Sequence, residues 1–441
     1  MKNNFPAILT ILGVTGDLAA KKILPALFNL FVKKELPDPF TIVGFGRREF
    51  TEETFRKYVK EMVEKRIHPS KTDALEQFVK IFTYHHGYFE QSESYPALKN
   101  KLESIEKDLG LKEHRRLYYF SILPELYATV FGKFKEAGVV SKATHSRIMI
   151  EKPFGRNLES ARELDALLKE YFTENKIYRI DHYFGKKIVE EILNFRQKNN
   201  LFGSDWDNQV VKEIQISLLE TVGVEHRGEF YDGVGAMRDM GQNHILAILS
   251  QLTMDKPNAH DGIHERRLQV LNDLKLLTED EVKDQSLRAQ YEGYKNIDGV
   301  SSQSQTETYF KIKFEINNDT WRGVPILAES GKRMQEQNKF ATVTLKNGQQ
   351  VTFELEPTEQ IIESGKPPVL FESPTHEHIQ YVAEYEKMLF DAIHGDRTLF
   401  VTDQEVEAMW RFTDPFVAAW QKNLVPLKFY PPDSTKGSPQ G

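Results

Sequence analysis

The densest concentration of reactive side chains lies in residues 178–187, YRIDHYFGKK. The stretch combines cations and hydroxyl donors with one carboxylate, Asp181. If a helix begins near Gly185, His182 and Lys186 lie close to its N-terminus, where backbone N–H groups also attract an anion. The stretch therefore predicts a phosphate-binding site. The alternative is an ordinary polar loop whose side chains are satisfied by their neighbours.

A second candidate is the glycine-rich loop that leads into a helix over residues 231–244, YDGVGAMRDMGQNH. His244 follows Met237 and Met240 along one face of that helix and precedes Ile248. From periodicity alone, a histidine in such a position is more often a hydrogen-bonded core residue than a catalyst. An imidazole can nevertheless accept a hydroxyl proton near neutral pH, so both interpretations stay open here.

A third candidate is the turn at residues 13–18, GVTGDL, between a short apolar run and a helix. A glycine turn in this position can bring backbone N–H groups against a pyrophosphate. The spacing is GxxG and not the full dinucleotide motif, so a plain strand-to-helix turn is the alternative. The buried strand before the turn and the helix after it favour a coenzyme site.

Two arginines after the second predicted strand bear on whether the coenzyme is NAD or NADP. A site for NAD normally has an acidic residue at the end of the second strand, where it binds the ribose 2′-hydroxyl. Here that strand ends in Gly44-Phe45-Gly46-Arg47-Arg48. Guanidinium groups suit a 2′-phosphate through charge-assisted hydrogen bonds, which predicts NADP as the cofactor. The alternative is a solvated arginine pair at the tip of a loop.

Composition excludes several classes of protein. The net charge of −7 argues against a nucleic-acid-binding protein, which needs clustered positive charge. The absence of cysteine excludes disulfides, thiolate catalysis and cysteine-ligated metal sites. The first apolar segment, about six residues long, is too short for a signal sequence or a membrane span. We therefore expect a cytoplasmic protein that does not bind a membrane.

The hydrophobic pattern predicts the elements that hold these residues. Ala7 to Leu12 form a continuous apolar run, typical of a strand buried on both faces of a parallel sheet. A helix follows, and Phe40 to Val43 give the next strand. Further strands are expected at 117–122 and 147–150, separated by helical stretches. This order predicts a Rossmann-like α/β dinucleotide-binding domain over residues 1–180.

The pattern changes in the second half of the chain. Apolar and polar residues alternate strictly at 213–218 and 310–316, which marks strands covered on one face. Asn347-Gly348, between two apolar segments, is a strong hairpin signal. We therefore predict an α+β domain with a large antiparallel sheet over residues 181–433, for substrate binding and assembly, followed by a polar tail at 434–441.

Five ordered motifs resemble those of the glucose-6-phosphate dehydrogenase family. Residues 179–186, RIDHYFGK, differ from the family's RIDHYLGK signature only at Phe184. The other four are the turn GVTGDLAAKK at 13–22, EKPFG at 151–155, RDMGQNH at 238–244, and GDRTLF with the helix after it at 395–415. The resemblance spans nearly the whole chain.

The resemblance implies an activity, the first oxidative step of the pentose phosphate pathway. Hydride would pass from C1 of glucose 6-phosphate to NADP, giving 6-phosphoglucono-1,5-lactone. His244 would be the general base for the C1 hydroxyl, and Asp181 would orient it and stabilise the imidazolium. No metal is expected, because the base takes the proton and the nicotinamide takes the hydride.

The resemblance also implies the residues that bind the two ligands. The substrate residues would be Lys152, His182, Tyr183, Lys186, Glu220, Asp239 and Lys332. The cofactor residues would be Gly13, Val14, Thr15, Gly16, Asp17, Leu18, Lys22, Arg47, Tyr119 and Lys152. Lys152 would contact both ligands, placed by a bond to Pro153 that is cis in the family.

Some positions depart from the family pattern. Glu329 stands where the family has an arginine that in some members helps to bind a second, structural NADP, so we predict no such site. Lys187 and Ala20 replace a glutamate and a lysine. The resemblance implies a homodimer, although the segment between Lys332 and Tyr385, in the sheet that carries the family's dimer contact, is shorter than in the family.

Two other functions stay open from the sequence. A related dehydrogenase could act on another sugar or sugar phosphate, and it would differ in the phosphate contact made by Lys186. A non-catalytic NADP-binding regulator could use the same fold, since fold alone does not secure activity. The presence together of His244, Asp181 and Lys152 argues against a regulator.

Overall fold

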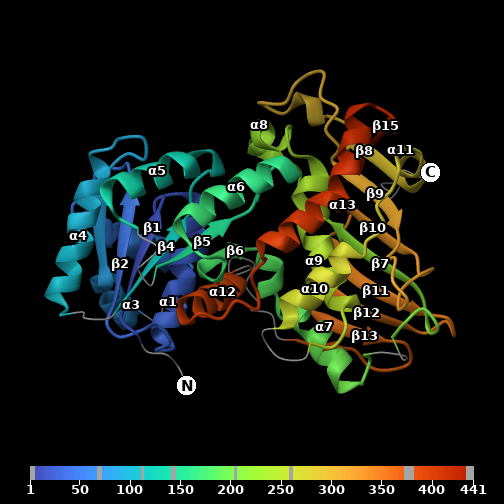
Figure 1. Ribbon diagram of the computed structural model, residues 1–441, viewed down its shortest axis with the longest axis horizontal. Coiled ribbons are helices and arrows are strands. Elements are labelled where there is room, and N and C mark those ends of the chain that lie inside the picture. Colours follow the sequence, from blue (N-terminus) through green and yellow to red (C-terminus); the bar gives the residue numbers. More distant parts are fainter. Residues whose placement is uncertain are drawn as a thin grey trace. The chain divides into compact units, whose positions relative to one another are not determined.

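The computed structural model describes residues 5–66, 72–110, 114–140, 146–202, 206–257, 262–371 and 382–433. The chain divides into two compact units (Figure 1). Unit 1 consists of Met1–Gly155, Arg162–Gly185 and Pro374–Asp403, and unit 2 consists of Arg156–Ala161, Lys186–Ser373 and Gln404–Gly441. The predicted polar tail at 434–441 lies outside the described residues.

Unit 1 contains a six-stranded parallel sheet in the order β3-β2-β1-β4-β5-β6. The strands are β1 (Ala7–Leu12), β2 (Phe40–Gly46), β3 (Phe82–His86), β4 (Arg115–Phe120), β5 (Arg147–Glu151) and β6 (Ile177–Ile180). Every residue of β1 is buried, as expected for a strand in the middle of such a sheet. The strand order reverses at β1 and β4, where doubly wound sheets bind their ligands. The predicted Rossmann-like domain is confirmed.

Helices connect these strands. They are the π-helix η1 (Ala19–Ile23), α1 (Leu24–Val32), α2 (Glu52–Glu64), α3 (Thr72–Phe78), α4 (Ser94–Asp108), α5 (Tyr127–Ala137) and α6 (Leu158–Tyr171), with short 3-10 turns at η3 (Val79–Ile81), η4 (Pro124–Leu126), η5 (Glu174–Lys176) and η6 (His182–Gly185). A helix from much later in the chain, α12 (Val382–His394), completes the unit.

The return of α12 differs from the predicted division into the contiguous segments 1–180 and 181–433. Met388 and Leu389 of α12 belong to the same hydrophobic core as Leu27 of α1. The Arg147 guanidinium donates to two carbonyls in the last turn of α12, those of Ala392 and Ile393, at 2.8 Å each. The amphipathic pattern of a helix does not show which partner its apolar face will meet, so this return is not visible in the sequence.

Unit 2 contains a nine-stranded sheet in the order β14-β13-β12-β11-β7-β10-β9-β8-β15. The strands are β7 (Val211–Leu219), β8 (Ser286–Tyr291), β9 (Tyr309–Phe314), β10 (Ile326–Gly331), β11 (Asn338–Leu345), β12 (Gln350–Glu356), β13 (Gln360–Glu363), β14 (Val369–Leu370) and β15 (Leu427–Tyr430). The predicted hairpin at Asn347-Gly348 joins β11 to β12, and Gly348 has a φ of +87°. Neighbouring strands are antiparallel, as predicted, except that β7–β10 and β8–β15 are parallel pairs, so the sheet is mixed.

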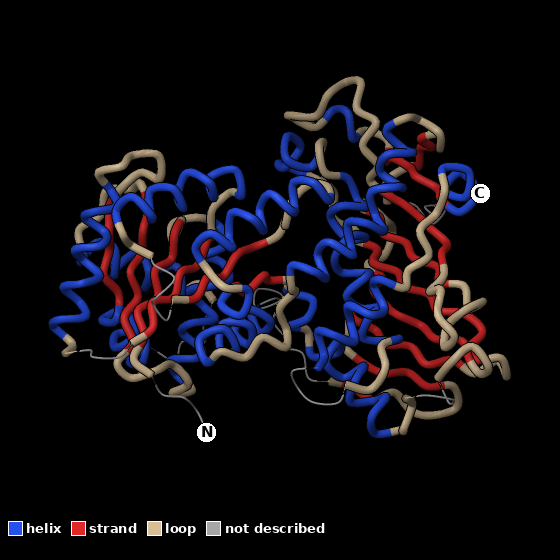
Figure 2. Tube along the Cα trace, viewed as in Figure 1, coloured by secondary structure: helices blue, strands red, loops and turns tan. Residues whose placement is uncertain are grey.

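Helices gather along one face of this sheet, as Figures 1 and 2 show for α7, α9, α10 and α13. The helices of unit 2 are α7 (Lys187–Lys198), α8 (Gly228–Tyr231), the π-helix η8 (Met237–Ile245), α9 (Leu246–Thr253), α10 (Ile263–Asn272), α11 (Glu279–Gln285) and α13 (Asp403–Gln421), with 3-10 turns at η7 (Glu225–Arg227) and η10 (Tyr294–Asn296). Throughout the described ranges, every helix is too short or too polar to cross a lipid bilayer.

We expect Gly13→Ala to lower the melting temperature of the protein more than Gly348→Ala does. Both glycines have a positive φ, +76° for Gly13 and +87° for Gly348. An alanine forced into such a backbone conformation lowers the free energy of unfolding by about 1 kcal/mol or more. A Cβ at Gly13 would also lie 2.3 Å from the Ser121 carbonyl oxygen, whereas nothing lies within 4 Å at Gly348. Calorimetry without coenzyme measures the melting temperature of both variants. Equal decreases in melting temperature would show that the backbone at Gly13 can shift to accommodate a Cβ.

Candidate active site

The glycine turn follows β1 directly and is fixed by backbone hydrogen bonds. The Gly13 N–H donates to the Phe45 carbonyl at 2.9 Å, and the Gly16 N–H donates to the Gly13 carbonyl at 2.9 Å. Val14 is buried, whereas Thr15 and Gly16 are half-buried and Asp17 is exposed. The turn therefore presents backbone to solvent at the start of a helix, as a pyrophosphate site requires.

The end of β2 lies beside this turn. A Cβ added at Gly46 would be 3.7 Å from Oγ1 of Thr15. The Tyr84 hydroxyl donates to the carbonyls of Gly46 at 2.8 Å and Arg48 at 2.6 Å, which fixes the path of the segment after the strand. Arg47 and Arg48 are exposed there. The Arg48 guanidinium lies 6.0 Å from the centre of the Tyr58 ring. The exposed glycine turn, followed by a helix, fits the phosphates of a dinucleotide.

A partly buried carboxylate lies between three elements of unit 1. Glu151, the last residue of β5, accepts hydrogen bonds from the hydroxyls of Tyr119 on β4 and Tyr385 on α12, the second at 3.4 Å. Lys152 follows it in the chain, and the Lys152-Pro153 bond is cis, as the resemblance implies. Tyr119, a predicted cofactor residue, is itself fully buried.

Burial dominates the electrostatics of Glu151. It raises the pKa of the carboxyl to about 7, and the hydrogen bonds from Tyr119 and Tyr385 and the charge of Lys152 oppose it only in part. The neighbouring charge of Asp181 adds to the rise. A carboxyl that titrates near neutral pH therefore lies beside a residue predicted to contact both ligands.

The predicted phosphate stretch forms the 3-10 turn η6, and α7 begins at Lys187 with Lys186 as its N-cap, close to the predicted start. Asp181 is buried and accepts a hydrogen bond from the Tyr183 N–H at 3.0 Å. The His182 ring lies parallel to that of Tyr385, with centroids 6.4 Å apart. Asp181, His182 and Tyr183 therefore share one short turn of unit 1.

Three of the predicted substrate residues meet in unit 2. The Lys332 ammonium, just after β10, lies 2.8 Å from a carboxylate oxygen of Glu220 and 3.3 Å from one of Asp239. The other oxygen of Glu220 lies 3.1 Å from the ammonium of Lys339, on β11. These four side chains are mostly buried, so the cluster is a built arrangement of charges and not a surface patch.

The cluster continues to Lys186. Glu356, the last residue of β12, lies 3.0 Å from the Lys339 ammonium through one oxygen and 3.0 Å from the Lys186 ammonium through the other. The side chains of Lys186, Lys339 and Glu356 are only 2%, 3% and 3% exposed. Lys339 and Glu356 were not predicted as site residues. A charged residue in an alternating strand is normally read as solvent-facing, so only burial identifies them.

The lysines decide the charge state of the carboxylates. Burial alone would raise the pKa of Glu220, but Lys332 and Lys339 outweigh it and lower the pKa to about 2. Burial also opposes the ionisation of Glu356, and Lys186 and Lys339 again lower its pKa below the ordinary value. Both glutamates of the cluster are therefore ionised at neutral pH.

His244 lies in the π-helix η8 and is 1% exposed. Hydrogen bonds from residue i to i+5 bring Asp239 and His244, five residues apart, to nearly the same face of this helix. π-Helical segments occur frequently at functional sites, and η1, which contains Lys22, is another one. Asp181 belongs to unit 1 and His244 to unit 2, and their predicted pairing stays a prediction.

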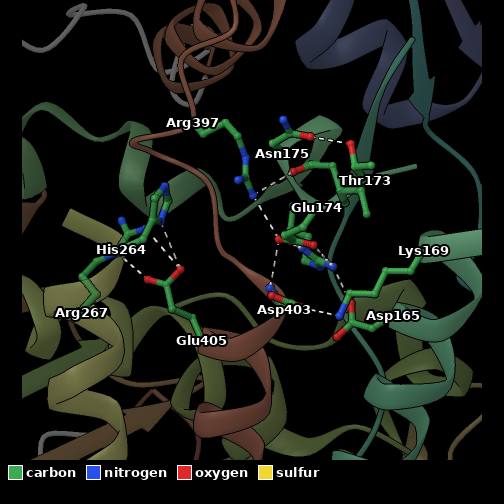
Figure 3. A network of polar contacts seen from close by, with 12 residues as sticks. Asp165, Lys169, Thr173, Glu174, Asn175, His264, Arg267, Arg397, Asp403 and Glu405 are labelled. Atoms are coloured by element: carbon green, nitrogen blue, oxygen red, sulfur yellow. Dashed lines mark hydrogen bonds and ion pairs between the residues drawn. The ribbon is translucent and has the colours of Figure 1, made fainter. Parts of the chain in front are cut away.

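Other buried charges are structural. In unit 1, Glu174 of η5 accepts a hydrogen bond from Arg397 at 3.0 Å and another from the buried Arg179 of β6 at 2.7 Å, which links the segment after α12 to η5 and β6. In unit 2, Glu405 lies 2.6 Å from Arg267. Figure 3 shows the residues around Glu174 and Glu405.

Comparison with known proteins identifies the family. Residues 10–191 match the family model described as "Glucose-6-phosphate dehydrogenase, NAD binding domain". Residues 193–380 and 368–440 match the model "Glucose-6-phosphate dehydrogenase, C-terminal domain". The chain belongs to the glucose-6-phosphate dehydrogenase family.

Two relatives and one solved structure match nearly all of the chain. The glucose-6-phosphate 1-dehydrogenase of Borreliella burgdorferi is 34% identical, with 97% of this chain and 95% of that protein covered. That of Bacillus subtilis is 32% identical, with 95% and 92% covered. A glucose-6-phosphate dehydrogenase solved in complex with its substrate glucose 6-phosphate is 28% identical with a TM-score of 0.88, covering 100% of this chain and 97% of that chain.

The raised pKa of Glu151 should make the stability of the protein depend on pH. Its pKa rises from 4.5 to about 7 on folding, so between these values the folded state holds a proton that the unfolded state has lost. Stability is therefore present at low pH and falls by up to about 3 kcal/mol as pH rises through this window. In Glu151→Gln the melting temperature should depend less on pH between 4.5 and 7.

The matched control is Glu53→Gln, because Glu53 is an exposed carboxylate of the same unit. This variant should keep the pH dependence of the wild-type protein. If Glu151→Gln also keeps it, another group is responsible for the loss of stability.

Proposed function

We propose that this protein oxidises the C1 hydroxyl of glucose 6-phosphate, with NADP as the hydride acceptor and 6-phosphoglucono-1,5-lactone as the product. Family membership supports the reaction. The observation that carries the proposal is the meeting of Lys332, Glu220 and Asp239 in one buried cluster of unit 2. Carboxylates and an ammonium group together can accept and donate the hydrogen bonds of sugar hydroxyls.

Oxidation removes a hydride and a proton from the same alcohol. When bound, NADP supplies the nicotinamide that accepts the hydride from C1. The His244 imidazole takes the proton of the C1 hydroxyl as the C1–O bond becomes a carbonyl. Asp181 orients the imidazole and stabilises its protonated form. No further proton acceptor is required at C1.

The other residues bind and orient the ligands. His182, Tyr183 and Lys186 hold the phosphate, and Glu220, Asp239 and Lys332 contact the sugar or its phosphate. Lys152 contacts both ligands. The coenzyme residues are Gly13, Val14, Thr15, Gly16, Asp17, Leu18, Lys22, Arg47 and Tyr119. A homodimer and a cytoplasmic location are also part of this proposal.

His244→Ala should retain substrate binding and lose kcat by about 100-fold or more, because a positioned base contributes about that much. Steady-state reduction of NADP with glucose 6-phosphate, followed by absorbance, measures the loss. The control is His226→Ala, an exposed histidine of the same unit, which should keep the wild-type rate. A wild-type rate in His244→Ala would refute the assignment of the base.

Arg47→Ala should lower kcat/KM for NADP by about 10- to 100-fold, which corresponds to the loss of charge-assisted hydrogen bonds to the 2′-phosphate. The same variant assayed with NAD is its own control, because NAD lacks this phosphate, and its kcat/KM should not fall. Equal or better turnover of the wild-type protein with NAD would contradict the coenzyme assignment.

A further inference from the structure

Glu356 is saturated by cationic and amide donors inside unit 2. One oxygen lies 3.0 Å from the Lys186 ammonium, and the other lies 3.0 Å from Lys339 and accepts a hydrogen bond from the Gln337 amide. The carboxylate is 3% exposed. Burial works against its ionisation, but Lys186 and Lys339 lower its pKa, so it carries a negative charge at neutral pH. The ammonium proposed to hold the substrate phosphate is thus already paired with an anion.

Ammonium and carboxylate groups alternate along the wider cluster. Lys186, Lys339 and Lys332 each lie within 3.3 Å of a carboxylate oxygen of Glu356, Glu220 or Asp239. A sugar phosphate brings up to two further negative charges. Because like charges repel strongly where water is scarce, the phosphate and the Glu356 carboxylate cannot both stay close to Lys186 without a large cost.

We propose that Glu356 is a specificity-determining residue, an internal anion that occupies Lys186 until the substrate phosphate displaces it. This inference rests on the proposed function, in which Lys186 holds the phosphate. Lys339 and Gln337 keep hold of the other carboxylate oxygen, so Glu356 can give up Lys186 without becoming an isolated buried charge. An uncharged sugar has no anionic group that could replace the Glu356 carboxylate beside Lys186. The pair therefore favours ligands whose anion can replace a carboxylate.

The test is Glu356→Gln, which keeps the shape of the side chain and removes its charge. The KM for glucose 6-phosphate and the dissociation constant for inorganic phosphate, by calorimetry, should each fall about ten-fold. The matched control is Glu354→Gln, a carboxylate of the same strand that bonds to Gln360 and lies outside the cluster, and it should leave both constants unchanged. Constants that rise or stay the same in Glu356→Gln would overturn the inference.

A structure of the wild-type protein with bound inorganic phosphate gives a second measurement that does not depend on the folding of a variant. The distance from Lys186 to Glu356 should lengthen beyond hydrogen bonding, while that from Lys339 to Glu356 stays near 3.0 Å. A Lys186–Glu356 pair that persists with phosphate on Lys186 would overturn the inference.

The phosphate measurements need no turnover, so the two proposals fail separately. If Glu356→Gln binds phosphate more tightly but the wild-type protein does not oxidise glucose 6-phosphate, the proposed function is wrong and the competition at Lys186 is supported. If the wild-type protein is active and Glu356→Gln changes neither constant, only the competition is wrong.

Discussion

The buried lysines of unit 2 are paired with carboxylates, and the candidate site of this unit depends on that pairing. Removing an ion from water costs several kcal/mol unless a partner and further hydrogen bonds compensate. Lys186, Lys339 and Lys332 obtain those partners from the segment after β7, from η8 and from the end of β12. The sheet must therefore form for the charges to meet, and once formed it holds them at fixed positions.

In unit 1, burial has a larger effect on the pKa of a carboxyl than its neighbours do, whereas the opposite holds in unit 2. Burial opposes ionisation of both Glu151 and Glu220, but two lysine ammonium groups within 3.1 Å outweigh it at Glu220. Glu151 is contacted by two tyrosine hydroxyls, and burial wins, so its pKa rises to about 7. One unit thus keeps permanent charges suited to recognising a polar ligand, and the other keeps a carboxyl that titrates near neutral pH.

Much of the local structure was predictable. The apolar run of β1, the glycine turn after it and the hairpin at Asn347-Gly348 all depend on residues a few positions apart, and the structure shows each of them. The motif at 178–187 gave the correct start of α7 to within two residues of Gly185. The return of α12, the parallel pairs in the second sheet and the roles of Tyr385, Lys339 and Glu356 were not predicted.

The sequence by itself determined the family, the Rossmann-like topology and the types of side chain available for the reaction, because motif order and hydrophobic periodicity are properties of neighbouring residues. Only the tertiary structure decided which charges meet. Lys186 and Glu356 are 170 positions apart, and Glu220 and Lys332 are 112 apart. Nothing local distinguishes these residues from solvated ones, since the free energy of a charge depends on the burial and partners that long-range folding gives it.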